Sequence, residues 1–286
     1  MTGIDVLPRG YFRVCISGTS SGIGKACVDY LRQFPSVNVK TIGRSPTDDI
    51  PVDMNDPNSV RECLNTIERL WYKSADSPSG GLDVWINNAG IFSAKTKAEV
   101  WWTNGLSPAF ITEDLSSRFL AHNIKSRMLR FVQVSSRLEA RSDLEKENMR
   151  ETISNAVSDS THRGSIEQYA DSKRAMIFHT AYMHYKHAAS HPSLSYVAVS
   201  PGMVNTNLGK SVVFSFLWWL TFPIRFLFLR SPIEGVLPIM YAAFGCPSES
   251  GVYTADQEII ERISVTRDPE AGQLFSQIVR ESFNTF

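Results

Sequence analysis

A tyrosine and a lysine four residues apart, Tyr169 and Lys173, form the pair in this chain best suited to proton transfer. Residues at this spacing share one face of a helix, so the ammonium lies beside the phenol. Lowering a tyrosine pKa from about 10 towards about 7 takes about 4 kcal/mol. A unit charge about 4 Å away supplies that much at an effective dielectric constant of about 20. Tyr169 is therefore predicted to act on a substrate oxygen as a general acid or base.

The same spacing recurs at Tyr182 and Lys186, 13 residues further along the chain. A helix rises about 1.5 Å per residue, so about 20 Å separates the two tyrosines and only one can reach a common site. Tyr169 begins a helix shortly after an expected strand, where a site would form. We therefore assign the chemistry to Tyr169, and packing or a surface position to Tyr182.

A second feature is a glycine-rich turn near the start of the chain. A strand-like apolar run over 12–17 leads into Gly18, Gly22 and Gly24 and then into a helical pattern. Glycine allows sharp turns and close approach of a ligand, and the first N–H groups of a helix favour an anion. An ordinary glycine-rich β–α turn is the alternative. The cofactor-binding candidates in this turn are Ser17, Gly18, Ser20, Ser21, Gly22, Ile23 and Gly24.

These features resemble the short-chain dehydrogenase/reductase family, whose turn reads Thr-Gly-x-x-x-Gly-x-Gly; Ser17 replaces the threonine and keeps a hydroxyl. The Asn-Asn-Ala-Gly stretch at 87–90, the Tyr-x-x-x-Lys at 169–173 and the Pro-Gly at 201–202 also match family motifs. The resemblance covers about 12–255 and implies a dinucleotide-dependent oxidoreductase. Beyond the turn it implies cofactor contacts from Asp53, Met54, Asn88, Ala89, Gly90, Tyr169, Lys173, Pro201, Gly202, Val204 and Thr206.

The end of the second expected strand bears on which dinucleotide binds. An enzyme that reads a free ribose 2′-hydroxyl usually carries an acid there, whereas a 2′-phosphate calls for a cation. This chain has Arg44 at that point and no acid until Asp48. The arginine fork suits a phosphate, and Lys25 could add a second charge. NADP (NADPH) is therefore expected rather than NAD, although a surface arginine without a role is the alternative.

The resemblance also assigns the remaining catalytic positions. Ser136, the second serine of the pair that ends the fifth expected strand, corresponds to the serine that hydrogen-bonds the substrate oxygen in the family. Asn104 corresponds to the asparagine that bends the preceding helix and holds a water in a proton relay through the lysine. The gap of 33 residues from Ser136 to Tyr169 is longer than is usual in the family. It weakens any inference about the substrate by analogy.

The elements that must position these groups alternate between strand and helix periodicity, which predicts an α/β fold: a doubly wound parallel sheet (Rossmann-type), helices on both faces, in a single domain over 1–286. Strands are expected at 12–17, 37–42, 50–52, 83–86, 130–134, 194–199 and 251–253, and helices at 22–34, 97–122 and 167–188. A further helix carries a buried stripe of Val60, Cys63, Leu64, Ile67, Leu70 and Trp71. The polar stretch over 137–166 is interpreted as an insertion or long loop.

Composition narrows the class of protein. The net charge is zero and no basic run occurs, so we expect no nucleic-acid partner. The first ten residues lack the apolar run of a secretory signal, and four scattered cysteines favour reduced thiols. A cytoplasmic protein, or one at the cytosolic face of a membrane, is expected. His184, His187 and His191 could share a helix face, but capping of a helix C-terminus is favoured over metal binding.

An apolar segment over 211–230 has nearly transmembrane length at its core of 18 residues, 212–229. A span is disfavoured because the chain must return to the same sheet, and Pro223 and Arg225 lie inside the segment. A lid over a lipophilic pocket, an interfacial membrane contact and a buried core helix remain as interpretations. Its position, the Ser-Pro-x-Glu-Gly at 231–235 and Gly-Val-Tyr at 251–253 resemble the retinol-dehydrogenase-like branch of the family.

Together these observations predict an NADP(H)-dependent oxidoreductase that acts on a carbonyl or alcohol carbon of a lipophilic substrate. Carbonyl reduction is the expected direction of the reaction. The alternatives are a non-catalytic dinucleotide sensor and a membrane-surface scaffold or lipid binder. A homo-oligomer and peripheral membrane contact through 211–230 stay open.

Overall fold

The computed structural model describes residues 11–73, 81–92, 95–122, 127–159, 161–202, 204, 231–246 and 248–285. Within them, eight strands form one sheet in the order β3-β2-β1-β4-β5-β6-β7-β8. Every pairing is parallel except that of β7 with β8, which is antiparallel. The predicted α/β class, with a doubly wound parallel sheet, is confirmed. The strands are β1 (Phe12–Ser17), β2 (Val37–Gly43), β3 (Ile50–Pro51), β4 (Val84–Asn87), β5 (Leu129–Val134), β6 (Leu194–Ser200), β7 (Val252–Ala255) and β8 (Glu258–Glu261).

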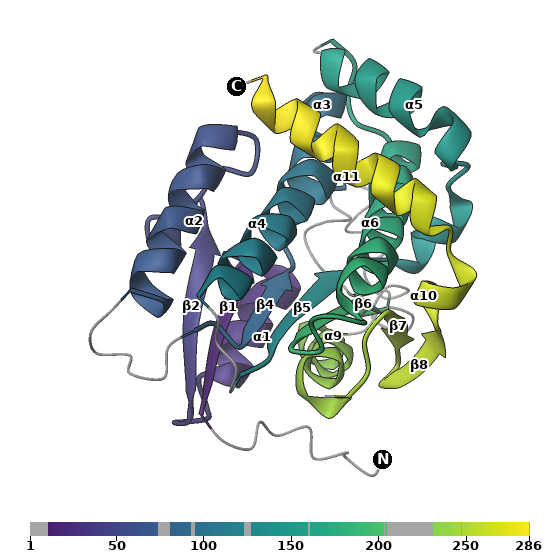
Figure 1. The fold of residues 1–286 in the computed structure, drawn as a ribbon. Coiled ribbons are helices and arrows are strands. Elements are labelled where there is room, and N and C mark those ends of the chain that lie inside the picture. The colour runs from purple at the N-terminus through teal and green to yellow at the C-terminus, as the bar shows by residue number, and fades with distance from the viewer. Residues whose placement is uncertain are drawn as a thin grey trace.

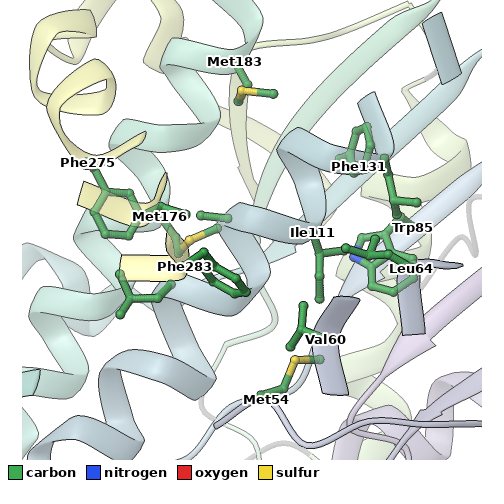
Figure 2. Packing of buried hydrophobic residues seen from close by; sticks show 14 of the residues in the cluster. Met54, Val60, Leu64, Trp85, Ile111, Phe131, Met176, Met183, Phe275 and Phe283 are labelled. Atoms are coloured by element: carbon green, nitrogen blue, oxygen red, sulfur yellow. The ribbon is translucent and has the colours of Figure 1, made fainter. Parts of the chain in front are cut away.

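Helices cover both faces of the sheet (Figure 1). Alternate residues of the strands point to opposite faces, so β4 sends Val84 and Ile86 to a core with α1 and α9, and Trp85 to a larger core with α2, α4 and α6. Figure 2 shows this larger core, in which Trp85 and Leu64 lie close together and Phe275 packs near Met176. The helices are α1 (Gly22–Leu31), α2 (Pro57–Trp71), α3 (Lys97–Trp101), α4 (Ser107–Ala121), α5 (Lys146–Ser158), α6 (Ile166–His187), α9 (Pro232–Met240), α10 (Ile263–Thr266) and α11 (Pro269–Asn284). Shorter turns are η1 (Trp102–Leu106) and η4 (Tyr241–Gly245), both π-helical, and the 3₁₀ turn η2 (Arg137–Arg141).

Two expectations are corrected. The stretch over 137–166 is not a long loop: it contains η2 and α5, because Met149, Ile153 and Ala156 recur at helical spacing and are buried. The expected helix over 97–122 forms as α3, η1 and α4 in succession, and its π turn contains Asn104, the residue expected to bend it. Leu70 is 40% exposed, because Trp71 takes the buried place in the last turn of α2.

The end of the chain adds two elements that the sequence analysis did not identify, β8 and α11. In α11, Phe275, Ile278, Val279 and Phe283 are buried against the larger core. The helix lies across α4 and α6 on the outside of the molecule (Figure 1). It therefore closes the side of α6 that faces away from the sheet.

Among the described helices, none combines the length and the apolar character needed to cross a bilayer. The apolar segment over 211–230 lies outside the described residues. All four cysteines are buried and free of disulfides.

Candidate active site

The glycine turn joins β1 to α1 at the carboxyl edge of the sheet. Gly18 and Gly22 have φ angles of +71° and +60°, which side-chain-bearing residues rarely adopt. A Cβ on Gly24 would lie 2.1 Å from the carbonyl oxygen of Gly18, and one on Gly18 would lie 2.6 Å from the Cα of Ala89. The turn therefore requires glycine for its own close packing as well as for any ligand.

The segment after β4 is bonded to this turn. The Ser17 hydroxyl accepts hydrogen bonds from the N–H groups of Asn88 (3.1 Å) and Ala89 (3.0 Å). In return the Asn88 amide donates to the carbonyl oxygens of Ser17 (2.9 Å) and Gly18 (3.0 Å). The serine in place of the family's threonine thus keeps a hydroxyl where two N–H groups need an acceptor. The two sequence motifs form one rigid unit.

The first turn of α1 has its N–H groups available for an anion. Ser20 and Ser21 are exposed, and Ile23 is half-buried. Within the described chain, Ser21 makes no side-chain cap on this helix and its first turn has no acidic residue. A phosphate group suits such a helix start, because the N–H groups and the helix dipole both favour negative charge. Lys25 does not extend this site, since its ammonium pairs with Asp29 at 2.6 Å.

The loop after β2 places two opposite charges near the turn. Arg44 is exposed immediately beyond the strand. The Asp48 carboxylate folds back and accepts hydrogen bonds from Thr19 (2.5 Å) and from the backbone of Ser45 (3.0 Å). A Cβ on Gly43 would lie 2.5 Å from this carboxylate. The Asp48 carboxylate therefore lies at the end of β2, although Asp48 is five residues beyond Gly43 in the sequence. The order of residues alone did not indicate this.

The residues after β3 have mainly supporting contacts. Asp53 is half-buried, and its carboxylate accepts from the backbone N–H of Asn55 at 3.0 Å. Met54 is buried in the larger core, and its carbonyl oxygen accepts from the Ser107 hydroxyl at 2.6 Å. These contacts hold the segment against η1 and α4.

Tyr169 and Lys173 lie on the first turns of α6, which begins at a capping box of Ser165 and Gln168. The Lys173 ammonium donates to the carbonyl oxygen of Val134 at 2.9 Å. It also lies over the Tyr169 ring, 5.6 Å from the ring centre. The Ser136 side chain lies close enough to the Tyr169 hydroxyl to lower the pKa of this phenol, which brings the third predicted catalytic residue into the group.

The protonation of this group differs from the prediction. Burial raises the pKa of Tyr169 to about 12, with the Ser136 hydrogen bond opposing the rise. Burial also lowers the pKa of Lys173 to about 8. The predicted lowering of the tyrosine pKa by the lysine is therefore wrong for the described residues. The physical reason is that the ammonium points to Val134 and the ring face, while the surroundings disfavour the phenolate.

Asn104 lies at the centre of the π turn η1 and is fully buried. Its side-chain oxygen accepts from the N–H of Ile91 and its amide donates to the carbonyl of the same residue, both at 2.8 Å. The amide also donates to Ser172 at 3.2 Å, and that hydroxyl donates to the carbonyl oxygen of Tyr169. Asn104 thus links the strand end after β4 to α6. Ser172 was missed as a site residue, although its place before Lys173 was visible in the sequence.

Gly90 joins the two halves of the site. A Cβ there would lie 3.5 Å from both the Asn104 side-chain oxygen and the Lys173 ammonium nitrogen. The glycine that follows the turn-bound Asn88 and Ala89 is therefore adjacent to two of the predicted catalytic side chains. Phe92 packs against the Tyr169 ring, with 4.8 Å between ring centres.

The last predicted motif follows β6. Pro201 is buried, and Gly202 has a φ of +83°. Val204 packs so closely on α9 that a Cβ on Gly235 would lie 2.7 Å from it, with Ile23 at 3.5 Å. Thr206 lies outside the described residues.

The histidines on α6 have other partners. His184 hydrogen-bonds Ser250 at 2.9 Å, and His187 lies 5.7 Å from His191 between ring centres. Burial lowers the pKa of His187 to about 4. In the described part of the chain, no three histidine, cysteine or acidic side chains gather as a metal site.

Solved structures share this fold. A short-chain type dehydrogenase/reductase from Mycobacterium marinum is 18% identical with a TM-score of 0.64, covering 92% of this chain and 98% of its own. An NADPH-bound carbonyl reductase from chicken fatty liver is 17% identical (TM-score 0.62; 88% and 99% covered). A 3-alpha-hydroxysteroid dehydrogenase from Pseudomonas sp. B-0831, complexed with NADH, is 19% identical (TM-score 0.63; 85% and 94% covered). No protein-family model and no curated protein sequence matches this chain.

Proposed function

We propose that this chain, which folds as short-chain dehydrogenase/reductases do, is an NADP(H)-dependent oxidoreductase that reduces a carbonyl carbon of a lipophilic substrate. The observation that carries the proposal is the convergence of Tyr169, Ser136 and Lys173 beside Gly90. An acid, a hydrogen-bonding hydroxyl and a buried ammonium thus meet next to the glycine turn that suits a pyrophosphate. The same edge of a doubly wound sheet is where such folds bind their ligands.

The protonation state of Tyr169 supports reduction. With a pKa of about 12, the phenol keeps its proton at neutral pH. A carbonyl oxygen that gains negative charge requires a proton donor, and a neutral phenol is one. Ser136 would hold the same oxygen by a hydrogen bond. Lys173 would keep positive charge beneath the phenol, and Asn104 would fix the segment that separates the two halves of the site.

The residues present fit a nicotinamide dinucleotide. The uncapped first turn of α1 would hold the pyrophosphate, and the segment at Gly90, next to Lys173, would take the nicotinamide end. When bound, the reduced cofactor supplies the hydride. We assign the 2′-phosphate to Arg44, because it is exposed at the end of β2 while Asp48 is already bonded to Thr19 and Ser45.

The substrate class rests on apolar character near the site. Phe92 packs on the Tyr169 ring, and the apolar segment over 211–230 follows the Pro-Gly motif in the sequence. The chicken carbonyl reductase and the Pseudomonas hydroxysteroid enzyme carry names that fit such substrates.

We also assign the chain to the retinol-dehydrogenase-like branch. In support, Ser231 and Glu234 of the Ser-Pro-Ile-Glu-Gly stretch form the capping box of α9. The glycine of that stretch, Gly235, also packs closely on Val204, which follows the Pro-Gly motif. Peripheral membrane contact through 211–230 is a separate proposal, tested by liposome flotation of the full chain and of a variant with charged substitutions in that segment.

Substitution of the two Tyr-x-x-x-Lys tyrosines tests the proposed reaction. Tyr169→Phe is expected to lower NADPH-dependent turnover of hydrophobic aldehydes and ketones by about 10²–10⁴-fold, the usual contribution of a positioned acid. NADPH binding, followed by its fluorescence, should persist. Tyr182→Phe, on the same helix with the same motif, is the matched control and should retain activity. Equal activity of wild type and Tyr169→Phe would refute the assignment, and binding without turnover in the wild type would favour a dinucleotide sensor.

A further inference from the structure

A second buried tyrosine lies on the strand next to the catalytic group. Tyr253 on β7 is only 2% exposed and pairs in register with Ala198 of β6. Its ring packs with Ile177 and Ala181, which belong to the same helix as Tyr169 and Lys173. The side chain is therefore held between the sheet and the catalytic helix α6.

The hydroxyl of Tyr253 is unusual in its surroundings. Within the described residues, no group hydrogen-bonds it with good geometry. Burial raises its pKa to about 12, and the hydroxyls of Ser200 and Ser135 lie close enough to oppose that rise. A buried hydroxyl without a partner is costly, whereas phenylalanine would fill the same space without that cost. Packing alone therefore does not explain a tyrosine at this position.

The two serines near this hydroxyl end neighbouring strands. The N–H of Ser135 donates to the carbonyl oxygen of Val199 at 2.7 Å, which places it beside Ser200. Ser135 directly precedes the catalytic Ser136, and Ser200 directly precedes the Pro-Gly motif. Any group that holds both serines also holds the ends of β5 and β6.

Each serine also contacts a backbone atom of the site. The Ser135 hydroxyl donates to the carbonyl oxygen of Lys173 at 3.5 Å, and the Ser200 hydroxyl accepts from the N–H of Gly202 at 3.4 Å. Both distances are long for hydrogen bonds that a hydroxyl group donates or accepts. A third hydroxyl that bonds to the serines would restrict their rotation and strengthen both contacts.

We propose that Tyr253 is a positioning residue: its hydroxyl, with those of Ser135 and Ser200, forms a buried cluster that fixes Ser136 and the Lys173 backbone relative to each other. In this proposal the cluster makes no contact of its own with substrate or cofactor. It acts through the strand ends, so it governs the chemical step rather than affinity for the dinucleotide. The inference rests on the proposed function for its kinetic consequence and on the fold alone for its structural one.

The test compares Tyr253→Phe with Tyr196→Phe. Tyr196 lies on β6 and is equally buried, and its hydroxyl is bonded to Ser116 at 2.9 Å, away from the site. Tyr253→Phe is expected to lower kcat by about tenfold, because the cluster loses one of its three hydroxyls, with the KM for NADPH within about twofold. Tyr196→Phe is expected to lower the Tm at least as much with kcat unchanged. A double variant, Tyr253→Phe with Ser135→Ala, should lose little more than either single variant, because coupled groups are not additive.

Hydrogen exchange measured by mass spectrometry gives a readout that needs no substrate. Tyr253→Phe should speed exchange at peptides covering 134–136 and 201–202, and leave those of β1 unchanged; Tyr196→Phe should not speed it there. Unchanged kcat and unchanged exchange in Tyr253→Phe would overturn the inference, as would an equal loss of kcat in Tyr196→Phe. Should Tyr253→Phe fail to fold, Ser135→Ala and Ser200→Ala face the same two measurements with the same expected and contrary results. Should the wild type reduce no carbonyl, the exchange result alone decides.

Discussion

The buried ammonium of Lys173 is expected to reduce the stability of the folded protein at neutral pH. Lys173 is 3% exposed, and burial lowers its pKa from 10.5 to about 8. At about 1.4 kcal/mol for each tenfold change, keeping the charge at pH 7 costs about 3 kcal/mol. Lys173→Met removes this cost, but leaves the Val134 carbonyl oxygen without its donor, a loss of about 1–3 kcal/mol. The variant should thus be as stable as the wild type at pH 7, or more stable by up to about 2 kcal/mol.

The pH dependence separates these two contributions. Between the folded and unfolded pKa values of Lys173, about 8 and 10.5, the unfolded wild-type chain binds a proton that the folded chain does not. Wild-type stability therefore rises with pH relative to Lys173→Met, by about 2 kcal/mol from pH 7 to pH 9.5. Urea unfolding at both pH values, followed by tryptophan fluorescence, measures the difference.

An exposed lysine provides the control for this experiment. Lys25 is 59% exposed and paired with Asp29, so Lys25→Met should show little change in the difference between the two pH values. A Lys173→Met difference that stays flat from pH 7 to pH 9.5 would show that the ammonium is solvated in the folded protein. The same outcome would refute the burial of this ammonium, on which the expected stability difference rests.

Three further substitutions address the turn, the cofactor and the helix link. Gly24→Ala should lower the Tm strongly and abolish NADPH binding, because the new Cβ would lie 2.1 Å from the Gly18 carbonyl oxygen. Gly105→Ala is the control, since its new Cβ would have its nearest contact at 3.4 Å. Equal Tm values for the two variants would contradict the packing argument. Arg44→Ala should raise the KM for NADPH by about 10–100-fold, the scale of a charge-assisted hydrogen bond, and leave the KM for NADH unchanged. An equal rise in the KM for both cofactors would exclude a contact of Arg44 with the 2′-phosphate. Asn104→Ala should cost about 1–3 kcal/mol by leaving the Ile91 backbone groups unpaired and should also lower kcat; an unchanged unfolding curve would argue against the link.

The parts of the fold that could be predicted from the sequence are those set by local patterns. The glycine turn, the parallel strands and the early positions of α6 depend on residues within a few turns of one another, and periodicity with glycine spacing is enough to identify them. The apolar faces of α5 and α11 were harder to recognise in the sequence. In α5 only three side chains are buried, and they stand in an otherwise polar stretch. For α11, the capping residue Asp268 and Pro269 marked a helix start that the sequence analysis did not use.

The parts that could not be predicted depend on burial and on contacts between distant segments. Asp48 reaches the end of β2 only because the loop after Arg44 folds back onto Thr19. The pKa of Tyr169 depends on how completely the surroundings exclude water, and the spacing to Lys173 carries no information about that. The spacing of residues in the sequence predicts which side chains lie together. Their protonation states depend on the burial and the charges around them.

The two Tyr-x-x-x-Lys pairs on α6 differ in what packs around them. Tyr182 is half-buried and faces the C-terminal helix: a Cβ on Gly272 of α11 would lie 2.5 Å from its Cβ and 2.2 Å from the Phe178 carbonyl oxygen. This contact requires glycine and brings α11 against the outer side of α6. The first pair lies where α6 meets the strand ends, so its ammonium finds the carbonyl oxygen of Val134. The C-terminal helix closes the outer side of α6 around Tyr182 and leaves Tyr169 beside Ser136. Of the two tyrosines, only Tyr169 is therefore placed for the proposed proton transfer.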